Sequence, residues 1–108
     1  MSSPPDAVTD DTLLGGRLRL RQPASGHRAG HDAMLLAASV AVRPGERVVD
    51  FGAGVGAAGL AVAQRARDID LVLVEIDPAL AGLASVNASS NGIAAEVLTL
   101  DVSAGAAV

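Results

Sequence analysis

Residues 47–60 read Arg-Val-Val-Asp-Phe-Gly-Ala-Gly-Val-Gly-Ala-Ala-Gly-Leu. The short apolar run from Val48 to Phe51 is typical of a buried parallel strand. Glycines follow at positions 52, 54, 56 and 59, and the Ala-rich segment 57–66 has the composition of a helix. Glycine allows a positive φ and lets a ligand approach the backbone, and a helix N-terminus presents free N–H groups and partial positive charge. The segment therefore predicts a strand, a glycine turn and a helix that form a nucleotide-binding corner.

A second strand is predicted at 71–74, where four apolar residues precede Glu75. A carboxylate about 20 residues after a glycine turn, at the end of the next strand, can accept hydrogen bonds from both hydroxyls of a ribose. Asp77-Pro78 then predicts a helix start, with Asp77 as the N-cap and Pro78 as the first helical residue. We therefore expect Glu75 to bind the ribose and Asp77 to cap a helix.

The glycines can be aligned with two different motifs. Residues 54–59 match GxGxxG, the dinucleotide fingerprint, which by itself is a weak signal. The second alignment is an acid followed at intervals of two by three glycines: Asp50, Gly52, Gly54 and Gly56. This pattern resembles motif I of the S-adenosylmethionine-dependent methyltransferases of the Rossmann-like class. Because the predicted strand ends at Phe51, the turn has to begin at Gly52, which favours the second alignment. An NAD(P)-binding oxidoreductase module and a non-catalytic interaction module remain the alternatives.

The composition limits what the 108 residues can do. The length suits one domain, and with a single Phe the core has to be built from Ala, Val, Leu and Ile. The absence of Cys excludes disulfides and thiolate chemistry and is compatible with a cytoplasmic protein, and the two His residues have no recognised metal-site spacing. The N-terminus does not resemble a signal peptide, and no apolar run approaches the roughly 18 residues of a membrane helix. The net charge of −4 gives no overall support for nucleic-acid binding.

The N-terminal part of the chain predicts a disordered tail at 1–11 and a β-hairpin at 12–23 around Gly15-Gly16, with the domain proper spanning 12–108. The second arm alternates Leu with Arg, so that the leucines share one face and the arginines the other. The arginine face is either a solvated strand surface or, together with Arg28, a strip that contacts RNA phosphates. No aromatic residues alternate with these cations to stack on bases. The candidate RNA-binding residues are Arg17, Arg19, Arg21 and Arg28.

Three further elements are predicted. Asp32 is a plausible N-cap for an apolar helix at 33–41, and a third helix is expected at 78–90, ended by Asn91-Gly92. A third strand is expected at 96–102, with Asp101 at its C-terminal end.

This order of elements resembles the N-terminal half of a class I methyltransferase across roughly residues 12–103. The resemblance implies an α/β fold, namely the first half of a Rossmann-like three-layer αβα domain with a parallel sheet, preceded here by the hairpin. Residues 26–37, Gly-His-Arg-Ala-Gly-His-Asp-Ala-Met-Leu-Leu-Ala, look like the segment before motif I in the bacterial tRNA(Val) adenine-N6 methyltransferase family. That family carries a basic residue, a small residue, often Thr, and then Asp before an apolar helix, and His31 stands here in the place of Thr.

The resemblance implies S-adenosylmethionine as the cofactor, RNA as the substrate class and adenine N6 of tRNA as the methylated atom. Asp32 would lie near the methionine end of the cofactor, and the three glycines of motif I would line the methionine and ribose. Glu75 would hold the ribose, and Asp101 with Val102 would meet the adenine. The candidate cofactor-binding residues are therefore Asp32, Asp50, Gly52, Gly54, Gly56, Glu75, Ile76, Asp101 and Val102.

One departure from the family concerns catalysis. Adenine-N6 methyltransferases of this type carry an Asn-Pro-Pro-aromatic motif after the fourth strand, whereas this sequence has no Asn-Pro-Pro, Tyr or Trp. We therefore expect a cofactor-binding half, from a longer protein or a truncated gene, that transfers no methyl group by itself. In the family's strand order 3-2-1-4-5-7-6 the strand at 48–51 is central, but here it becomes an apolar edge, which favours self-association.

Overall fold

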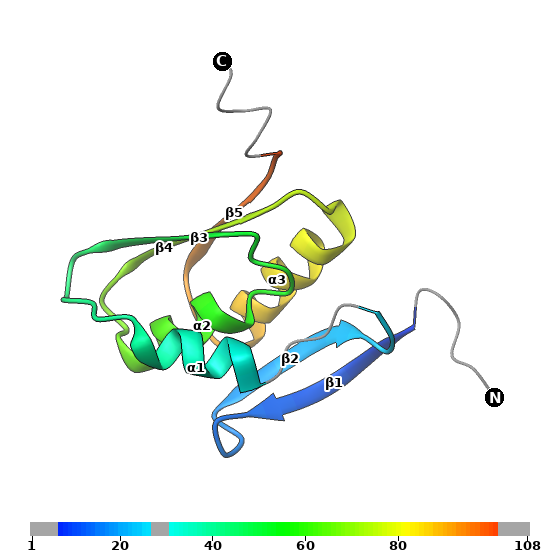
Figure 1. Ribbon diagram of the computed structural model, residues 1–108, viewed down its shortest axis with the longest axis horizontal. Coiled ribbons are helices and arrows are strands. Elements are labelled where there is room, and N and C mark those ends of the chain that lie inside the picture. The colour runs from blue at the N-terminus through cyan, green and yellow to red at the C-terminus, as the bar shows by residue number, and fades with distance from the viewer. Residues whose placement is uncertain (1–6, 27–30, 102–108) are drawn as a thin grey trace.

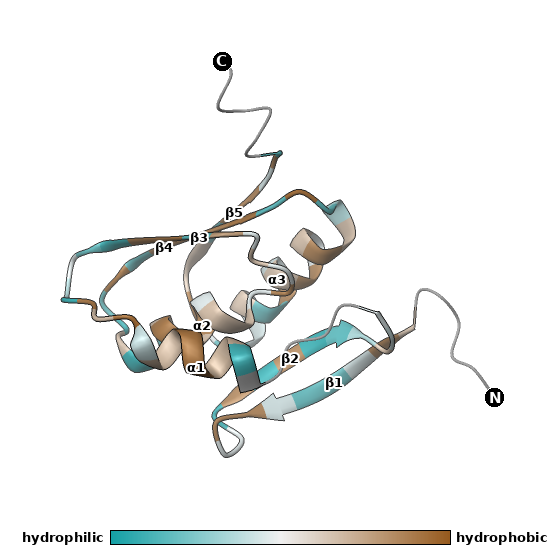
Figure 2. Ribbon diagram, in the orientation of Figure 1, coloured by the Kyte–Doolittle hydropathy of each residue, from teal (hydrophilic) through white to brown (hydrophobic). Residues whose placement is uncertain are grey.

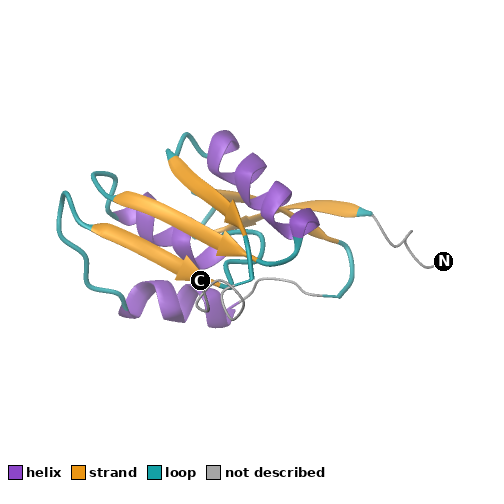
Figure 3. Ribbon diagram, turned by 90° about the horizontal axis from the view of Figure 1, so that it is seen from above, coloured by secondary structure: helices purple, strands orange, loops and turns teal. Residues whose placement is uncertain are grey.

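The computed structural model describes residues 7–26 and 31–101. A parallel sheet of three strands lies over three helices, and an antiparallel hairpin packs beneath the helices (Figures 1 and 3). The sheet has the order β3-β4-β5. Its strands are β3 (Arg47–Phe51), β4 (Asp70–Glu75) and β5 (Ala95–Thr99). The helices are α1 (His31–Ser39), α2 (Ala57–Arg65) and α3 (Pro78–Ser90), and the hairpin is β1 (Val8–Leu13) with β2 (Leu18–Pro23). The predicted α/β fold class, strand order and hairpin are confirmed.

Strand β4 is central in the sheet and is buried on both faces along 71–75. Its partners follow a regular parallel register, in which Leu73 is opposite Asp50 of β3 and Val97 of β5. The continuous apolar run of β4 suits a central strand whose side chains are buried on both faces, by the helices on one and by neighbouring side chains on the other. Because the three strands are parallel, their carboxyl ends lie together at one end of the sheet. The glycine turn lies at this end.

The core lies between the sheet, the helices and the hairpin. Its fully buried leucines come from all three layers: Leu18, Leu20, Leu60, Leu71 and Leu73. Small residues on α2 and α3 bring these helices close to the sheet, and a Cβ atom added at Gly59 would lie 2.5 Å from Leu73 Cδ2. The alternation of β2 is as predicted, with buried leucines and exposed arginines. Figure 2 shows many hydrophilic residues along the hairpin, whereas α1 is hydrophobic over most of its length.

The opposite face of the sheet has none of the described elements over it (Figure 1) and is apolar toward the carboxyl ends of β3 and β4. Val49 and Phe51 of β3 are 40% and 65% exposed on this face. They are paired with Val72 and Val74 of β4, which are buried by their neighbours. The expectation that 48–51 is a buried strand is therefore wrong for one of its faces, because β3 has a single strand neighbour and helices on one side only among the described residues.

The hairpin is longer than its sequence suggests. Strand β1 begins at Val8, so residues 8–11 belong to the hairpin and not to a disordered tail; residues 1–6 are outside the described part. Paired backbone and a side-chain cluster hold this segment, since Asp11 Oδ2 accepts hydrogen bonds from Thr9 Oγ1 (2.7 Å) and Gln22 Nε2 (2.8 Å). The polar composition of 8–11 is thus compatible with a strand that has a partner.

Two other predicted boundaries are corrected. Helix α1 begins at His31, so Asp32 lies within its first turn and is not its cap, and the helix ends at Ser39 where Arg65 Nη2 donates to the carbonyls of Ala37 (2.9 Å) and Val40 (2.7 Å). Strand β5 ends at Thr99, opposite the last residue of β4. Asp101 therefore follows the strand instead of ending it. No helix among the described residues is long and apolar enough to span a membrane.

Candidate functional site

The glycine turn between β3 and α2 has three positive φ angles at alternating positions. They are 76° at Gly52, 59° at Gly54 and 94° at Gly56. Residues with a Cβ atom rarely adopt this backbone region, which explains the spacing of the glycines. The turn is fixed to β4, because the N–H groups of Gly52 and Ala53 both donate to Val74 O at 2.9 Å. A Cβ atom at Gly52 would meet nothing within 4 Å, so the start of the turn borders open space.

Glu75 ends β4 directly beside this turn, as its spacing predicts. Its side chain is 7% exposed, and Gly54 N–H donates to Oε1 at 2.7 Å while Asp77 N–H donates to Oε2 at 3.0 Å. Hydrogen bonds to a charged acceptor are short and strong, so the carboxylate has a fixed orientation. Each carboxylate oxygen can accept a further hydrogen bond. Glu75 therefore keeps hydrogen-bonding capacity for two hydroxyl groups in this fixed orientation.

Asp50 lies on the helix-facing side of β3 and places a second carboxyl group near Glu75. Burial raises the pKa of Asp50 above its ordinary value, a hydrogen bond from the Gly59 backbone opposes this rise, and the negative charge of Glu75 adds to it. The sequence motif thus brings two acidic groups to the carboxyl ends of adjacent strands. A cation beside the turn would be attracted to this pair.

Asp77 is a helix cap, as predicted. Its Oδ1 accepts hydrogen bonds from Ala79 N (2.9 Å) and Leu80 N (3.4 Å), and Pro78 occupies the first turn of α3. The side chain is exposed and oriented toward its own helix. The two neighbouring carboxylates, Glu75 and Asp77, therefore have the separate roles that the sequence suggests: one is at the glycine turn and the other is at the helix end.

The other described candidates, Asp32, Ile76 and Asp101, lie at the same end of the sheet as the glycine turn. Ile76 follows Glu75 directly and is 58% exposed. Asp101 is exposed and follows β5, while Val102 is outside the described residues. Asp32 is exposed in the first turn of α1, and Figure 3 shows that this turn lies at the end of the sheet where the strand arrows point.

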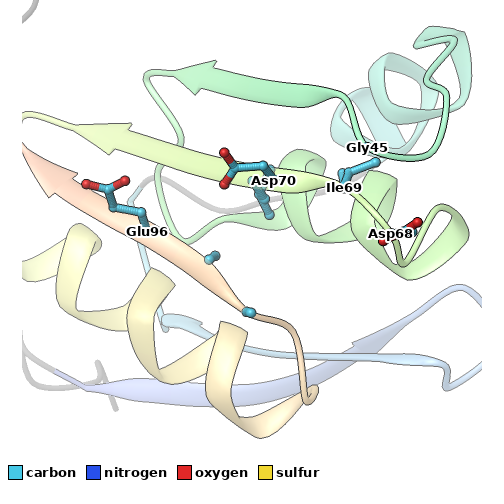
Figure 4. Close-up of a pocket in the computed structure, with 8 residues that line it drawn as sticks. Gly45, Asp68, Ile69, Asp70 and Glu96 are labelled. Carbon is cyan, nitrogen blue, oxygen red and sulfur yellow. The ribbon is translucent and has the colours of Figure 1, made fainter.

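A hollow of about 500 Å³ lies at the opposite end of the sheet. It is lined by Gly45, Asp68, Ile69, Asp70, Leu71, Ala94, Ala95 and Glu96. Figure 4 shows its three carboxylates at separate positions along the hollow, and Asp70 Oδ2 accepts a hydrogen bond from Arg47 Nε at 2.7 Å. In the described part of the chain, no three His, Cys, Asp or Glu residues are grouped so that they could hold a metal ion. The hollow, at the amino ends of the strands, therefore offers no metal site among the described residues.

The arginines of the hairpin are exposed, but two of them have partners. Arg21 Nε is 2.9 Å from Asp10 Oδ1 on the neighbouring strand, and Arg17 Nε donates to Leu14 O at 3.0 Å. An exposed ion pair of this kind contributes little to stability, so Arg21 can exchange its partner at small cost. Arg28 is outside the described residues. The outer face of the hairpin is thus of mixed charge and richer in cations than in anions.

The sequence does not reveal that Asn87 contacts the glycine turn. Its side chain is fully buried and donates a hydrogen bond to Val55 O (2.9 Å) in the glycine turn. The only local signal is a polar residue on the buried side of an otherwise apolar helix, beside Ala84 and Ala88. Its partners are distant in the sequence, and no spacing motif describes them.

Comparison with known proteins gives consistent matches. The family model described as Methyltransferase small domain matches residues 25–107. The tRNA1(Val) (adenine(37)-N6)-methyltransferase of Bacteroides thetaiotaomicron is 41% identical over 61 residues, which are 56% of this chain and 26% of that protein.

Solved structures have the same fold. M. jannaschii TYW2 in complex with AdoMet has a TM-score of 0.73 at 12% identity, over 94% of this chain and 47% of that one. The T. thermophilus 16S rRNA N2 G1207 methyltransferase RsmC, solved with AdoMet and guanosine, has a TM-score of 0.68 at 24% identity, over 89% of this chain and 28% of that one. The chain therefore spans about a quarter of the curated relative and less than half of each of these two structures.

Proposed function

Because the chain belongs to the methyltransferase small domain family, we propose that it forms the cofactor-binding half of an S-adenosylmethionine-dependent methyltransferase. The observation that carries this proposal is the Glu75 carboxylate, which two backbone N–H groups hold beside a turn with three positive φ angles. A buried carboxylate with free lone pairs suits a ribose, and a glycine backbone suits a ligand that approaches closely.

Each candidate residue is assigned to one part of the cofactor in this proposal. Glu75 binds the ribose hydroxyls, and the exposed side chain of Ile76 offers an apolar contact to the adenine, which Asp101 and Val102 complete. The glycine turn lines the ribose and methionine, with Asp32 near the methionine end. When bound, S-adenosylmethionine supplies an electrophilic methyl group on a sulfonium. The negative charge of Glu75 and the nearby Asp50 carboxyl favours this cation over a neutral ligand.

We propose RNA as the substrate class, with adenine N6 of a tRNA as the methyl acceptor and the cytoplasm as the place of action. The support is the resemblance of residues 26–37 and the identity to the Bacteroides enzyme, whose name states that reaction. Phosphate contacts would come from the hairpin, where Arg17, Arg19 and Arg21 are exposed, together with Arg28. These contacts would position RNA without reading its sequence.

Calorimetric titration with S-adenosylhomocysteine tests the proposed cofactor. We expect binding by the natural chain and its loss in Gly54→Val, because a branched side chain at this turn position enters the path of the ligand. Gly45→Val is the matched control: Gly45 also has a positive φ, 85°, but it lies in the turn before β3 at the other end of the sheet. Binding of NADH without binding of S-adenosylhomocysteine would instead support the dinucleotide alternative.

The isolated chain is proposed to be catalytically inactive and to self-associate. Positioning an exocyclic amine needs hydrogen-bond acceptors and a stacking surface, and the sequence has no Asn-Pro-Pro, Tyr or Trp to supply them. Transfer of a radiolabelled methyl group to tRNA by this chain, above a control without protein, would contradict the first proposal. Self-association would arise at strand β3, which is an edge of the sheet.

A further inference from the structure

Helix α3 holds the hairpin through two asparagine side chains on successive turns. Strand β2 pairs with β1 along one edge, so the backbone groups of Arg19 and Arg21 on its other edge need different partners. Asn87 accepts from Arg21 N–H (2.7 Å) and donates to Arg21 O (2.9 Å). Asn91 likewise accepts from Arg19 N–H (2.9 Å) and donates to Arg19 O (2.6 Å).

The spacing of the two asparagines along the helix axis matches the spacing of the two arginines along β2. Residues four apart on a helix are separated by about 6 Å along its axis. Residues two apart on an antiparallel strand are separated by about 6.8 Å. The two side-chain amides therefore take the place of a third hairpin strand, and they cover an edge that would otherwise expose unpaired backbone groups.

Asn87 differs from Asn91 in where its remaining hydrogen bond goes. The second N–H of Asn87 Nδ2 donates to Val55 O at 2.9 Å, whereas Nδ2 of Asn91, the C-cap residue of α3, donates to Asn87 O at 2.7 Å. Val55 lies between Gly54 and Gly56, and Gly54 N–H is bonded to the Glu75 carboxylate. One buried side chain therefore joins the hairpin backbone directly to the glycine turn.

We propose that Asn87 is a positioning residue that couples docking of the hairpin to the geometry of the glycine turn. The inference rests on the proposed function, in which this turn lines the cofactor and the outer face of the hairpin contacts RNA. A docked hairpin orients Asn87, Asn87 fixes Val55, and the fixed turn presents Gly54 and Glu75 to the ligand. Coupling between two sites is reciprocal, so RNA that binds the docked hairpin more tightly than the undocked one and the cofactor increase each other's affinity.

A pair of matched variants separates this role from a merely structural one. Asn87→Ala and Asn91→Ala both remove two hydrogen bonds to β2, but only Asn87→Ala releases the Val55 carbonyl. We expect Asn87→Ala to weaken S-adenosylhomocysteine binding about tenfold, within the usual range of coupling between sites, and Asn91→Ala to weaken it less than twofold. In Asn87→Ala alone, amide hydrogen exchange should become faster at Gly54 relative to Asp70, whose N–H is bonded to Glu46 O at the far end of the sheet.

The natural chain provides a test that does not depend on the folding of a variant. S-adenosylhomocysteine should slow exchange of the Arg21 amide, which is bonded to Asn87, by more than it slows exchange of the Asp70 amide. Equal slowing at these two amides, or equal effects of the two Ala variants, would overturn the coupling while leaving the cofactor site intact. Failure of the natural chain to bind S-adenosylhomocysteine would overturn the proposed function and the coupling together.

Discussion

At the scale of single residues, the site depends on two neighbouring acids with different tasks. Glu75 is buried and accepts hydrogen bonds from two backbone N–H groups of different loops, whereas Asp77 is exposed and accepts them from the start of its own helix. Their positions two residues apart are enough to direct one side chain into the site and the other onto α3.

The Glu75→Ala change should weaken S-adenosylhomocysteine binding by tenfold or more. The reason is the loss of a charged acceptor for two hydroxyls, which contributes about 1.5–3 kcal/mol. Asp77→Ala is the matched control and should lower the free energy of unfolding by about 1 kcal/mol, the usual effect of removing an N-cap, with little change in affinity. Titration calorimetry and denaturant unfolding of both variants would measure this. If Asp77→Ala lost affinity and Glu75→Ala lost only stability, the roles would be reversed.

The raised pKa of Asp50 predicts that the free energy of unfolding depends on pH. Because burial raises its pKa in the folded state, the folded chain holds this proton more tightly than the unfolded chain does. The stabilisation is fully present below the ordinary pKa of an Asp and is lost as the pH rises through the raised value. Asp50→Asn does not titrate and can still accept the Gly59 hydrogen bond. Its unfolding free energy should therefore increase relative to the natural chain between about pH 4 and pH 7. A difference that stays constant or shrinks over this range in urea unfolding would contradict the argument.

At the scale of the elements, helix α2 sits so close to β4 that one position has no room for a side chain. A Cβ atom at Gly59 would lie 2.5 Å from Leu73 Cδ2 and 3.4 Å from Leu71 Cδ1. Gly82 on α3 is also helical, but a Cβ atom there would meet nothing within 4 Å. The two glycines therefore have opposite consequences when a methyl group is added.

We expect Gly59→Ala to lower the free energy of unfolding by about 1–3 kcal/mol, the usual effect of overpacking a core. Gly82→Ala should raise it by about 0.5–1 kcal/mol, because Ala has the higher helix propensity and the site is open. Thermal and denaturant unfolding would measure both changes. Similar effects of the two substitutions would show that the α2–β4 contact is looser than its geometry indicates.

The elements that sequence predicts well are those whose signals are local. The turn glycines, the Asp77-Pro78 start of α3 and the Asn91 end of the same helix each follow from backbone chemistry within a few residues. The limits of β1 and β5 were missed because they depend on where a partner strand runs. Asn87 was missed for the same reason, since its hydrogen bonds to Arg21 join residues 66 positions apart. Local backbone chemistry therefore predicts the glycine turn and the acids beside it. Contacts between residues far apart in the sequence determine which side chains hold that turn in place.

At the scale of the whole molecule, the sheet has one covered and one open side. The three helices and the hairpin lie on one face, and the apolar face with Val49 and Phe51 has no described element over it (Figure 1). Strand β3 is also an edge of the sheet. An apolar edge without Pro or Lys is a surface on which another strand can pair.

The isolated chain should therefore associate with itself. We expect the sedimentation coefficient to increase with protein concentration, and Val49→Lys to reduce this increase because a charge on an edge strand opposes pairing. Val86→Lys is a suitable control, since Val86 is 46% exposed on α3, away from the edge. A monomer at all concentrations, with a cooperative unfolding transition, would contradict the prediction.

The asparagine bridge between α3 and the hairpin has a consequence for the order in which the chain folds. A hairpin of neighbouring residues closes quickly, whereas a contact across 66 residues has to wait for a large loop to close. During synthesis the hairpin leaves the ribosome before α3 does, and the outer edge of β2 has neither asparagine to bind until residue 87 has emerged. We expect pulse-labelled hydrogen exchange during refolding to protect the Arg21 amide later than the amides shared between β1 and β2. The glycine turn then reaches its final shape only when β2 and α3 have met.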